Sequence, residues 1–190
     1  MKIALDIDNV LAETFKSFLE FYKDRFKEIS LEDIQDEYFW TLISVSKGDF
    51  LYLFKDFYKQ NKIDVVENSP KGMEYLSTKH ELVFITSRSP ELKEKTLVYL
   101  KNNFGITAPK ILFSQYHGED MMSKEEFCVL EKVDLLIEDS MFHSISCADK
   151  GILVFLLDRP WNKTASHERI TRCKDWAEII ENVRRMEDGK

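Results

Sequence analysis

Two acidic side chains stand two residues apart near the start of the chain, within Leu5-Asp6-Ile7-Asp8-Asn9-Val10-Leu11-Ala12. They follow a short apolar run that is typical of a buried strand, so both carboxylates should lie where that strand ends. Open α/β sheets bind ligands at this edge. Two close carboxylates raise each other's pKa unless a cation neutralises them, and Mg²⁺ prefers oxygen ligands. Asp6 and Asp8 are therefore candidate metal ligands and catalytic residues.

Polar side chains also follow two later apolar runs. Thr86-Ser87-Arg88 follows one of them, and Glu138-Asp139 ends another with a second acidic pair. Lys124 lies in the first turn of an expected helix, where a positive charge opposes the helix dipole. Taken singly, these residues could be helix caps, a turn or a surface lysine. Taken together, they place hydroxyls, a lysine and carboxylates at one sheet edge.

The elements that must position these residues follow an alternating pattern. Five apolar runs predict buried strands of a mostly parallel sheet: Lys2–Ile7, Glu81–Thr86, Lys110–Ser114, Asp134–Glu138 and Ile152–Leu157. Helical patterns lie between them: Pro70–Thr78, Pro90–Asn103, Ser123–Lys132 and Met141–Lys150. This alternation predicts an α/β fold with a doubly wound, Rossmann-like parallel sheet.

The segment after the first strand breaks this alternation and is rich in aromatic residues. Phe15, Phe18, Tyr22 and Phe26 recur at helical spacing, which predicts a small helical cap over residues 14–69. Residues 1–13 and 70–190 would then form the catalytic core. Most of the rings should pack in the interior of the cap. Phe18, Phe21 and Trp40 are the first candidates for rings that face a substrate.

Composition excludes several classes of function. The net charge of −7 disfavours binding to a nucleic-acid polymer, which requires clustered Lys and Arg. No stretch approaches the roughly 20 apolar residues of a membrane span, and acidic residues interrupt the N-terminal apolar run too early for a signal peptide. Cys128, Cys147 and Cys173 form no C-x-x-C pair, so a zinc site or disulfide framework is not expected. We expect a cytoplasmic protein.

The four strand-edge features, in this order, resemble the haloacid-dehalogenase-like hydrolase superfamily. Asp6-x-Asp8 looks like its first motif, Thr86 its second, Lys124 its third and Glu138-Asp139 its fourth. The resemblance spans most of the chain. It implies a Mg²⁺-dependent phosphomonoesterase in which Asp6 attacks phosphorus and forms an aspartyl-phosphate.

The resemblance also implies roles for the other residues. Asp8 would protonate the leaving oxygen and later activate water. Mg²⁺ would be held by Asp6, the backbone carbonyl of Asp8, and Asp139, with Glu138 nearby. The phosphoryl oxygens would be bound by three further residues, which are Thr86, Ser87 and Lys124.

A closer resemblance is to the cytosolic 5′(3′)-deoxyribonucleotidase-like group. It rests on the first motif, on the cap directly after it, and on Asp158-Arg159-Pro160-Trp161-Asn162 after the last predicted strand. Asn9 stands where Gly is common in the group, and Glu138 replaces an Asp. The group implies a nucleoside monophosphate or a similar small phosphorylated metabolite as substrate. Arg88, Asn162 and Trp40 are candidate substrate contacts.

Two non-enzymatic alternatives use similar residues. A phospho-receiver module also combines acidic residues, a Thr and a Lys, but its phosphorylated Asp ends the third strand and it lacks a helical insertion. A silent scaffold protein would need no chemistry, yet Asp6, Asp8, Lys124 and Asp139 are all present. A phosphatase of another small metabolite also stays open, as does the oligomeric state, with a homodimer among the options.

Overall fold

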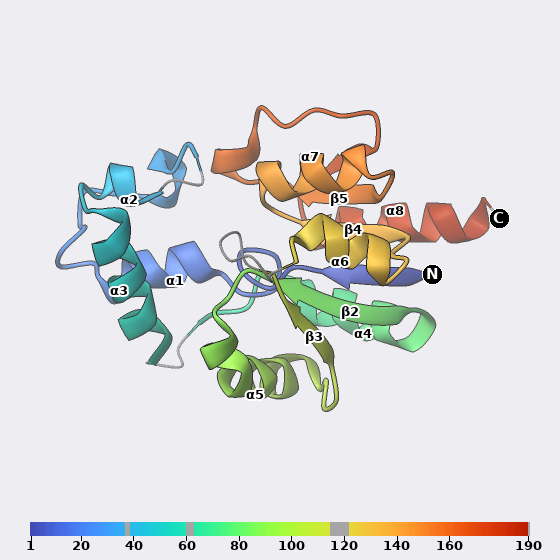
Figure 1. Cartoon of the computed structure of the whole chain (residues 1–190), viewed down its shortest axis with the longest axis horizontal. Coiled ribbons are helices and arrows are strands. Elements are labelled where there is room, and N and C mark those ends of the chain that lie inside the picture. Colours follow the sequence, from blue (N-terminus) through green and yellow to red (C-terminus); the bar gives the residue numbers. More distant parts are fainter. Residues whose placement is uncertain (37–38, 60–62, 115–121, 190) are drawn as a thin grey trace.

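The computed structural model describes residues 1–36, 39–59, 63–114 and 122–189. Its centre is a parallel six-stranded sheet in the order β3-β2-β1-β4-β5-β6 (Figure 1). The strands are β1 (Lys2–Leu5), β2 (Glu81–Thr86), β3 (Lys110–Phe113), β4 (Leu135–Glu138), β5 (Leu153–Leu157) and β6 (Ile170–Cys173). The chain runs outward from β1 through β2 to β3, then returns to the other side of β1. The functional edge should therefore lie between β1 and β4.

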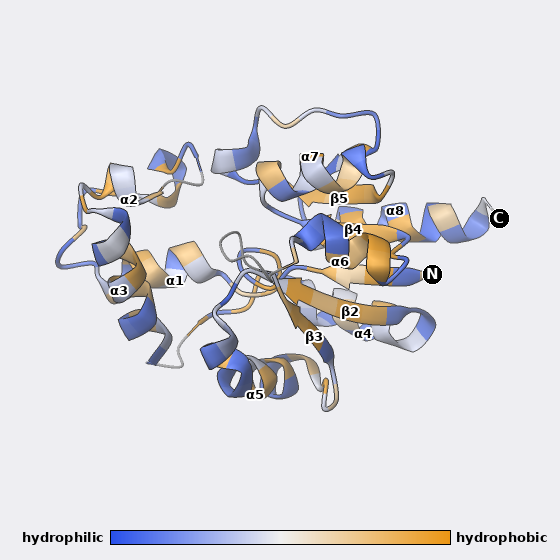
Figure 2. Ribbon diagram, viewed as in Figure 1, coloured by the Kyte–Doolittle hydropathy of each residue, from blue (hydrophilic) through white to orange (hydrophobic). Residues whose placement is uncertain are grey.

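Helices cover both faces of the sheet, so the core has three layers. One face packs against α4 (Ser69–Lys79), α5 (Lys93–Phe104) and α8 (Trp176–Asp188). The other face packs against α6 (Lys124–Leu130) and α7 (Met141–Asp149). Figure 2 shows the hydrophobic strands enclosed between helices that carry hydrophilic residues. This arrangement confirms the predicted doubly wound α/β fold.

The sheet and its helices extend beyond the prediction at the C-terminal end. Sequence reasoning did not find β6, a short strand at the sheet edge that reads Ile-Thr-Arg-Cys. It also gave no bounds for α8, although Asp175 caps this helix by accepting a hydrogen bond from the Glu178 amide. The predicted helix at residue 90 begins as the 3₁₀ helix η2 (Pro90–Leu92) before α5. The observed first strand, β1, is shorter than the predicted one and ends at Leu5.

Residues 14–59 contain helices whose apolar side chains form a second hydrophobic cluster, which also includes Trp161 of the core. These are α1 (Thr14–Phe21), η1 (Leu31–Asp33), α2 (Phe39–Leu42) and α3 (Lys47–Lys59). Their buried rings contact one another in a cluster that includes Phe18, Phe39, Phe50 and Phe57. In Figure 1 these helices lie to one side of the sheet, next to the carboxyl ends of its strands. They are placed to contact whatever binds at that edge.

Two further observations concern the chain as a whole. None of the helices in the described part of the chain combines the length and the apolar character that crossing a membrane requires. Cys128, Cys147 and Cys173 are buried as free thiols.

Candidate active site

The carboxyl ends of β1 and β4 bring three buried carboxylates together. Asp6 directly follows β1, Glu138 ends β4, and Asp139 comes next. One carboxylate oxygen from each of these residues lies within 4.8 Å of the other two. The pairing of β1 with β4 places Asp6 beside Glu138 at the sheet edge, because the Asp6 amide donates a hydrogen bond to the Ile137 carbonyl at 3.0 Å. The structure thus gathers a potential set of metal ligands at the switch point of the sheet.

Lys124 joins this cluster from the first turn of α6. Ser123 and Glu126 form a capping box there, which fixes the start of the helix. The buried Lys124 ammonium donates to Asp6 Oδ1 at 2.8 Å and to Glu138 Oε2 at 2.6 Å. Burial acts to lower the pKa of Lys124, but the two carboxylates outweigh it and raise that pKa above its usual value. A lysine that is unfavourable for its helix therefore supplies a permanent positive charge beside Asp6.

The electrostatic balance of the site favours one more cation. Burial raises the pKa of Asp6 to about 7, against the opposing effect of Lys124. When all of these groups are ionised, four carboxylates face two cations and two negative charges remain: Asp6, Asp8, Glu138 and Asp139 against Lys124 and Arg88. A divalent cation would balance them, and buried carboxylate oxygens are the ligands that Mg²⁺ prefers. The donor set therefore fits Mg²⁺.

Asp8 is held by a bidentate ion pair with Arg88. The Arg88 guanidinium donates from Nη2 to Asp8 Oδ1 at 2.8 Å and from Nε to Oδ2 at 2.9 Å. The hydroxyls of Thr14 and Tyr58 also donate to Oδ1, that of Tyr58 at 2.9 Å. Burial opposes ionisation, but Arg88 holds the pKa of Asp8 below its ordinary value. Asp8 is a carboxylate here, and donating a proton requires some of these bonds to exchange.

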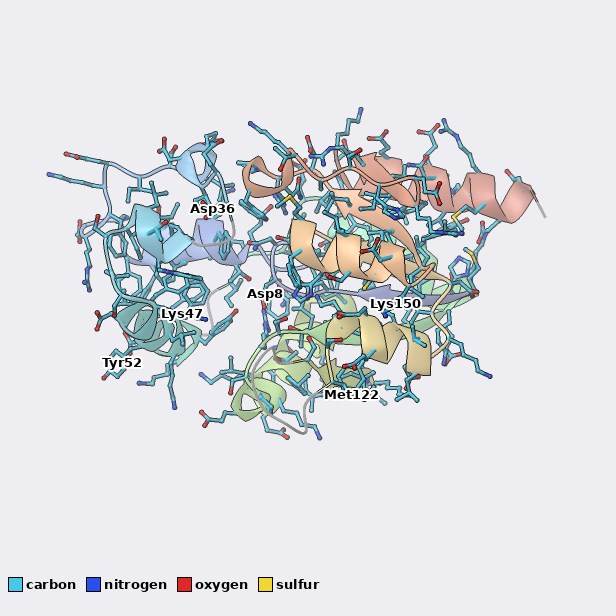
Figure 3. All side chains as sticks on the ribbon, turned by 45° about the horizontal axis from the view of Figure 1, so that its top comes forward. Asp8, Asp36, Lys47, Tyr52, Met122 and Lys150 are labelled. Atoms are coloured by element: carbon cyan, nitrogen blue, oxygen red, sulfur yellow. The ribbon has the colours of Figure 1, made fainter. Side chains whose placement is uncertain are left out.

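Arg88 is enclosed by residues from α3, among the helices of residues 14–59, and from α5, beside the sheet. Its guanidinium lies 5.1 Å from the ring centre of Tyr58 in α3 and 5.8 Å from that of Tyr99 in α5. It also donates to the Thr96 hydroxyl at 3.2 Å. We expected Arg88 to touch the substrate, and it does line the cavity described below, but its charge is paired with Asp8. Figure 3 shows Asp8 where the helices of residues 14–59 meet the core.

The turn after Asp8 explains the residue at position 9. Asn9 has a φ of 57°, in the left-handed region that favours glycine and that asparagine tolerates better than most residues. Its side-chain Oδ1 accepts a hydrogen bond from the Phe15 amide at 3.0 Å, at the start of α1. Its backbone carbonyl accepts from Arg159 Nε at 3.0 Å. Asparagine can therefore replace the expected glycine and also fasten α1 to the turn.

The hydroxyls after β2 lie at different depths. Thr86 is fully buried, and its Oγ1 accepts a hydrogen bond from the Arg88 amide at 3.2 Å. Ser87 lines the cavity, and its hydroxyl lies 3.3 Å from His143 Nε2 and 3.4 Å from the Ser114 hydroxyl. Burial and the charge of Lys124 lower the pKa of His143 to about 3, so this imidazole is neutral. Of these two hydroxyl residues, Ser87 is the one that lines the cavity.

The short 3₁₀ helix η3 (Pro160–Asn162) after β5 holds Asp139 from two directions. The Trp161 indole donates from Nε1 to Asp139 Oδ2 at 2.9 Å. The Asn162 amide donates to the Asp139 carbonyl at 2.7 Å and to the Leu157 carbonyl at 2.8 Å. Asn162 is fully buried, so it supports the metal-ligand candidate and does not reach the cavity as a substrate contact.

A cavity of about 650 Å³ opens over the acidic cluster. Its lining combines polar side chains, among them Asp6, Asp8, Ser87 and Asp139, with several aromatic rings. The rings that line it are Phe15, Phe50, Phe54, Tyr58 and Trp161. The cavity can therefore receive a molecule with an anionic end and a flat apolar body.

The three rings that we expected to face the substrate lie elsewhere. Phe18 is fully buried and stacks on Phe54 with ring centres 4.5 Å apart, so it belongs to the interior of the helical segment. Phe21 lines a separate surface hollow, and Trp40 packs against Phe50 and does not line the cavity. None of the three rings lines the cavity in this structure, because helical spacing identifies an apolar face without showing which neighbour it meets.

Sequence reasoning missed several residues that hold the site together. Thr14 and Tyr58 bind Asp8, yet neither belongs to a recognisable motif. Arg159 and Trp161 were noted only as parts of a segment that resembles the nucleotidase group. A polar residue at the start of α1, six residues after Asp8, was the one signal that could have identified Thr14.

Comparisons with known proteins agree with this geometry. The protein BH1399 of Halalkalibacterium halodurans, whose name places it among nucleotidases, is 27% identical over 184 residues, which cover 93% of this chain and 89% of that protein. Nucleotidase CA_C3379 of Clostridium acetobutylicum is 22% identical, with 98% and 95% covered. The solved structure of the haloacid-dehalogenase-like protein ATU0790 from Agrobacterium tumefaciens has a TM-score of 0.68 at 15% identity, with 98% of each chain covered.

A family model covers nearly the whole sequence. The model described as 5′ nucleotidase, deoxy (pyrimidine), cytosolic type C protein (NT5C) matches residues 1–186. The match includes the acidic cluster, the helices of residues 14–59 and the turn after β5. The chain therefore belongs to the NT5C family of 5′-nucleotidases, has the haloacid-dehalogenase-like fold, and is a phosphomonoester hydrolase.

Proposed function

We propose that this phosphomonoesterase hydrolyses nucleoside monophosphates in a Mg²⁺-dependent reaction with Asp6 as its nucleophile. The observation that carries the proposal is the position of Asp6. Its carboxylate is held by Lys124, lies within a cluster of buried carboxylates with Glu138 and Asp139, and lines an aromatic cavity. The names of the nucleotidase relatives support the same class of substrate.

The reaction divides into two displacements at phosphorus. In the first, an Asp6 oxygen bonds to phosphorus, the bond from phosphorus to the leaving oxygen breaks, and Asp8 supplies the proton that this oxygen needs. In the second, water attacks the aspartyl-phosphate while Asp8 takes up a proton. Phosphate then leaves and Asp6 is restored. Arg88 must loosen its hold on Asp8 during this cycle, because a fully paired carboxylate cannot carry the transferred proton.

The charge on the phosphoryl oxygens is offset by the residues around Asp6. Lys124 contributes its ammonium group, and Thr86 and Ser87, at the end of β2, contribute their hydroxyls. Mg²⁺ would be held by Asp6, the backbone carbonyl of Asp8, and Asp139, with Glu138 nearby, and would stabilise negative charge on the phosphoryl group. Glu138 also accepts hydrogen bonds from the backbone amides of Asp139 and Ser140, and these bonds order the loop after β4.

We further propose that residues 14–69 act as a cap over a catalytic core formed by residues 1–13 and 70–190. Three contacts support this position of the cap, because each joins α3 to the core beside the cavity. Lys55 pairs with Glu91 at 3.0 Å, Lys95 donates to the Tyr58 carbonyl at 2.9 Å, and Tyr58 binds Asp8. A cap in this position excludes water from the phosphoryl group and contacts the leaving group.

Metal removal tests the proposed chemistry. Phosphate release from a panel of nucleoside monophosphates, sugar phosphates and p-nitrophenyl phosphate should stop in excess EDTA and return when Mg²⁺ is added. Ca²⁺ should restore little activity, because it takes more ligands at longer distances than Mg²⁺. Full activity in EDTA would refute the metal. Absence of steady turnover for every ester would instead favour a receiver or scaffold role, and turnover of sugar phosphates alone would indicate another metabolite.

A second prediction concerns the aromatic wall of the cavity. Phe54→Ala should lower kcat/KM for the preferred nucleotide by about 5- to 150-fold, the range that corresponds to one lost base–ring stacking contact. Hydrolysis of p-nitrophenyl phosphate should change much less. Tyr52→Ala is the matched control, because Tyr52 is 73% exposed on the side of α3 away from Asp8 (Figure 3). Equal losses for both substrates in Phe54→Ala would argue against a base-binding cavity.

A further inference from the structure

Trp161 contacts the acidic cluster and also lines the aromatic part of the cavity. Its indole N–H meets the carboxylate of Asp139, and its ring is one wall of the aromatic cavity. The side chain is only 3% exposed, and its ring centre lies 4.9 Å from that of Phe15 in α1. One residue therefore contacts both a candidate metal ligand and the space above the phosphoryl site.

From this contact we infer that Trp161 is a positioning residue that orients Asp139 for the metal. The inference rests on the proposed function, because it assumes that Asp139 is a ligand. Indole offers one donor and no acceptor, so its bond at 2.9 Å favours the ionised, ligating form of Asp139. Hydrogen bonds to ligating carboxylates fix their orientation, and loss of such a bond typically weakens metal binding by about 10- to 100-fold.

The turn that carries Trp161 is itself rigidly attached. The fully buried Asn162 side chain donates to the carbonyls of Asp139 and Leu157, so it bonds η3 both to the residue after β4 and to the end of β5. Arg159 donates to the Asn9 carbonyl at 3.0 Å and pairs with Glu13 at 3.5 Å. The indole is thereby held at a fixed place relative to both acidic loops. A side chain that served only as a hydrophobic wall would not need this bonding.

Direct metal binding separates a positioning role from a packing role. Mn²⁺ binding to the intact protein can be measured by electron paramagnetic resonance of the free ion, without substrate. Trp161→Phe keeps an aromatic ring but loses the donor, and it should weaken Mn²⁺ binding by about 10-fold or more. The Mg²⁺ concentration for half-maximal activity should rise in parallel. Turnover at saturating Mg²⁺ should largely recover, which a merely disrupted site would not show.

Trp176→Phe is the matched control. The Trp176 indole is equally buried and donates to a backbone carbonyl, that of Val10, at 2.8 Å. Its replacement removes the same kind of hydrogen bond without touching a carboxylate, so Mn²⁺ affinity should stay within about threefold, below the usual effect of losing a bond to a ligand. If Trp161→Phe does not fold, replacement of Trp161 by benzothienylalanine removes the N–H from a nearly identical ring.

The outcomes distinguish this inference from the proposed function. Wild-type affinity in either donor-free Trp161 variant would overturn the positioning role while leaving the metal site intact. Equal losses in the Trp161 and Trp176 variants would also overturn it, because the effect would then be general loosening. Failure of the wild-type protein to bind Mn²⁺ would overturn the metal site itself, and the inference with it.

Discussion

Asp6→Asn should lower turnover by more than about 10⁴-fold, the scale on which removal of a nucleophile acts in hydrolases. The change is nearly isosteric, but the amide cannot attack phosphorus and is a poorer metal ligand. Lys124 would keep one partner in Glu138, 2.6 Å away, so the fold should survive. Phosphate release and circular dichroism of the purified variant test both statements. Turnover within tenfold of wild type would contradict the mechanism.

The second large effect is expected at Asp8. Asp8→Asn should slow the hydrolysis of alkyl and nucleoside phosphates by about 10²- to 10⁴-fold, the usual contribution of a positioned general acid–base. Asparagine is preferable to alanine, because it retains an acceptor for Arg88, which is buried and paired with Asp8. Removing one partner of a buried ion pair typically costs about 3–5 kcal/mol, so urea unfolding should show reduced stability.

The leaving group provides the internal control for Asp8. p-Nitrophenolate needs little protonation to depart, so the first displacement of p-nitrophenyl phosphate should be much less affected than that of an alkyl phosphate. A variant that had only lost stability would lose both activities in the same proportion. The comparison uses the leaving group released in the first turnover, because the attack of water on the aspartyl-phosphate is the same step for both substrates. Equal losses in the rate of this first displacement would therefore argue against Asp8 as the acid.

Much of the fold could be predicted because the core strands have a simple signal. Strands β1, β2, β4 and β5 are buried on both faces, so each reads as a nearly continuous apolar run. The edge strand β6 has a mixed sequence and only one neighbour, β5, and no such signal marks it. The sequence also does not explain why glycine is common at position 9, because only the left-handed φ of Asn9 in the structure shows the reason.

The acidic cluster could be predicted because residues at the ends of parallel strands must meet. The sheet order places Asp6 beside Glu138 and Asp139 without any contribution from the loops. Contacts between the cap helices and the core follow no such rule. Tyr58 reaches Asp8 across 50 positions in sequence, and the rings that line the cavity include Phe15 and Phe54 but neither Phe18 nor Trp40. Such contacts depend on how α1 and α3 pack against the core.

The most direct test of the central claim is chemical identification of the phosphorylated residue. Asp8→Asn should accumulate the phosphoenzyme from p-nitrophenyl phosphate, because the first displacement proceeds while the attack of water is slowed. Borohydride reduces an aspartyl-phosphate to homoserine, which mass spectrometry of the N-terminal peptide locates. We predict homoserine at position 6 after reaction with substrate and Mg²⁺, and none without substrate. An unmodified Asp6 beside phosphate on a histidine, a serine or another aspartate would contradict the account.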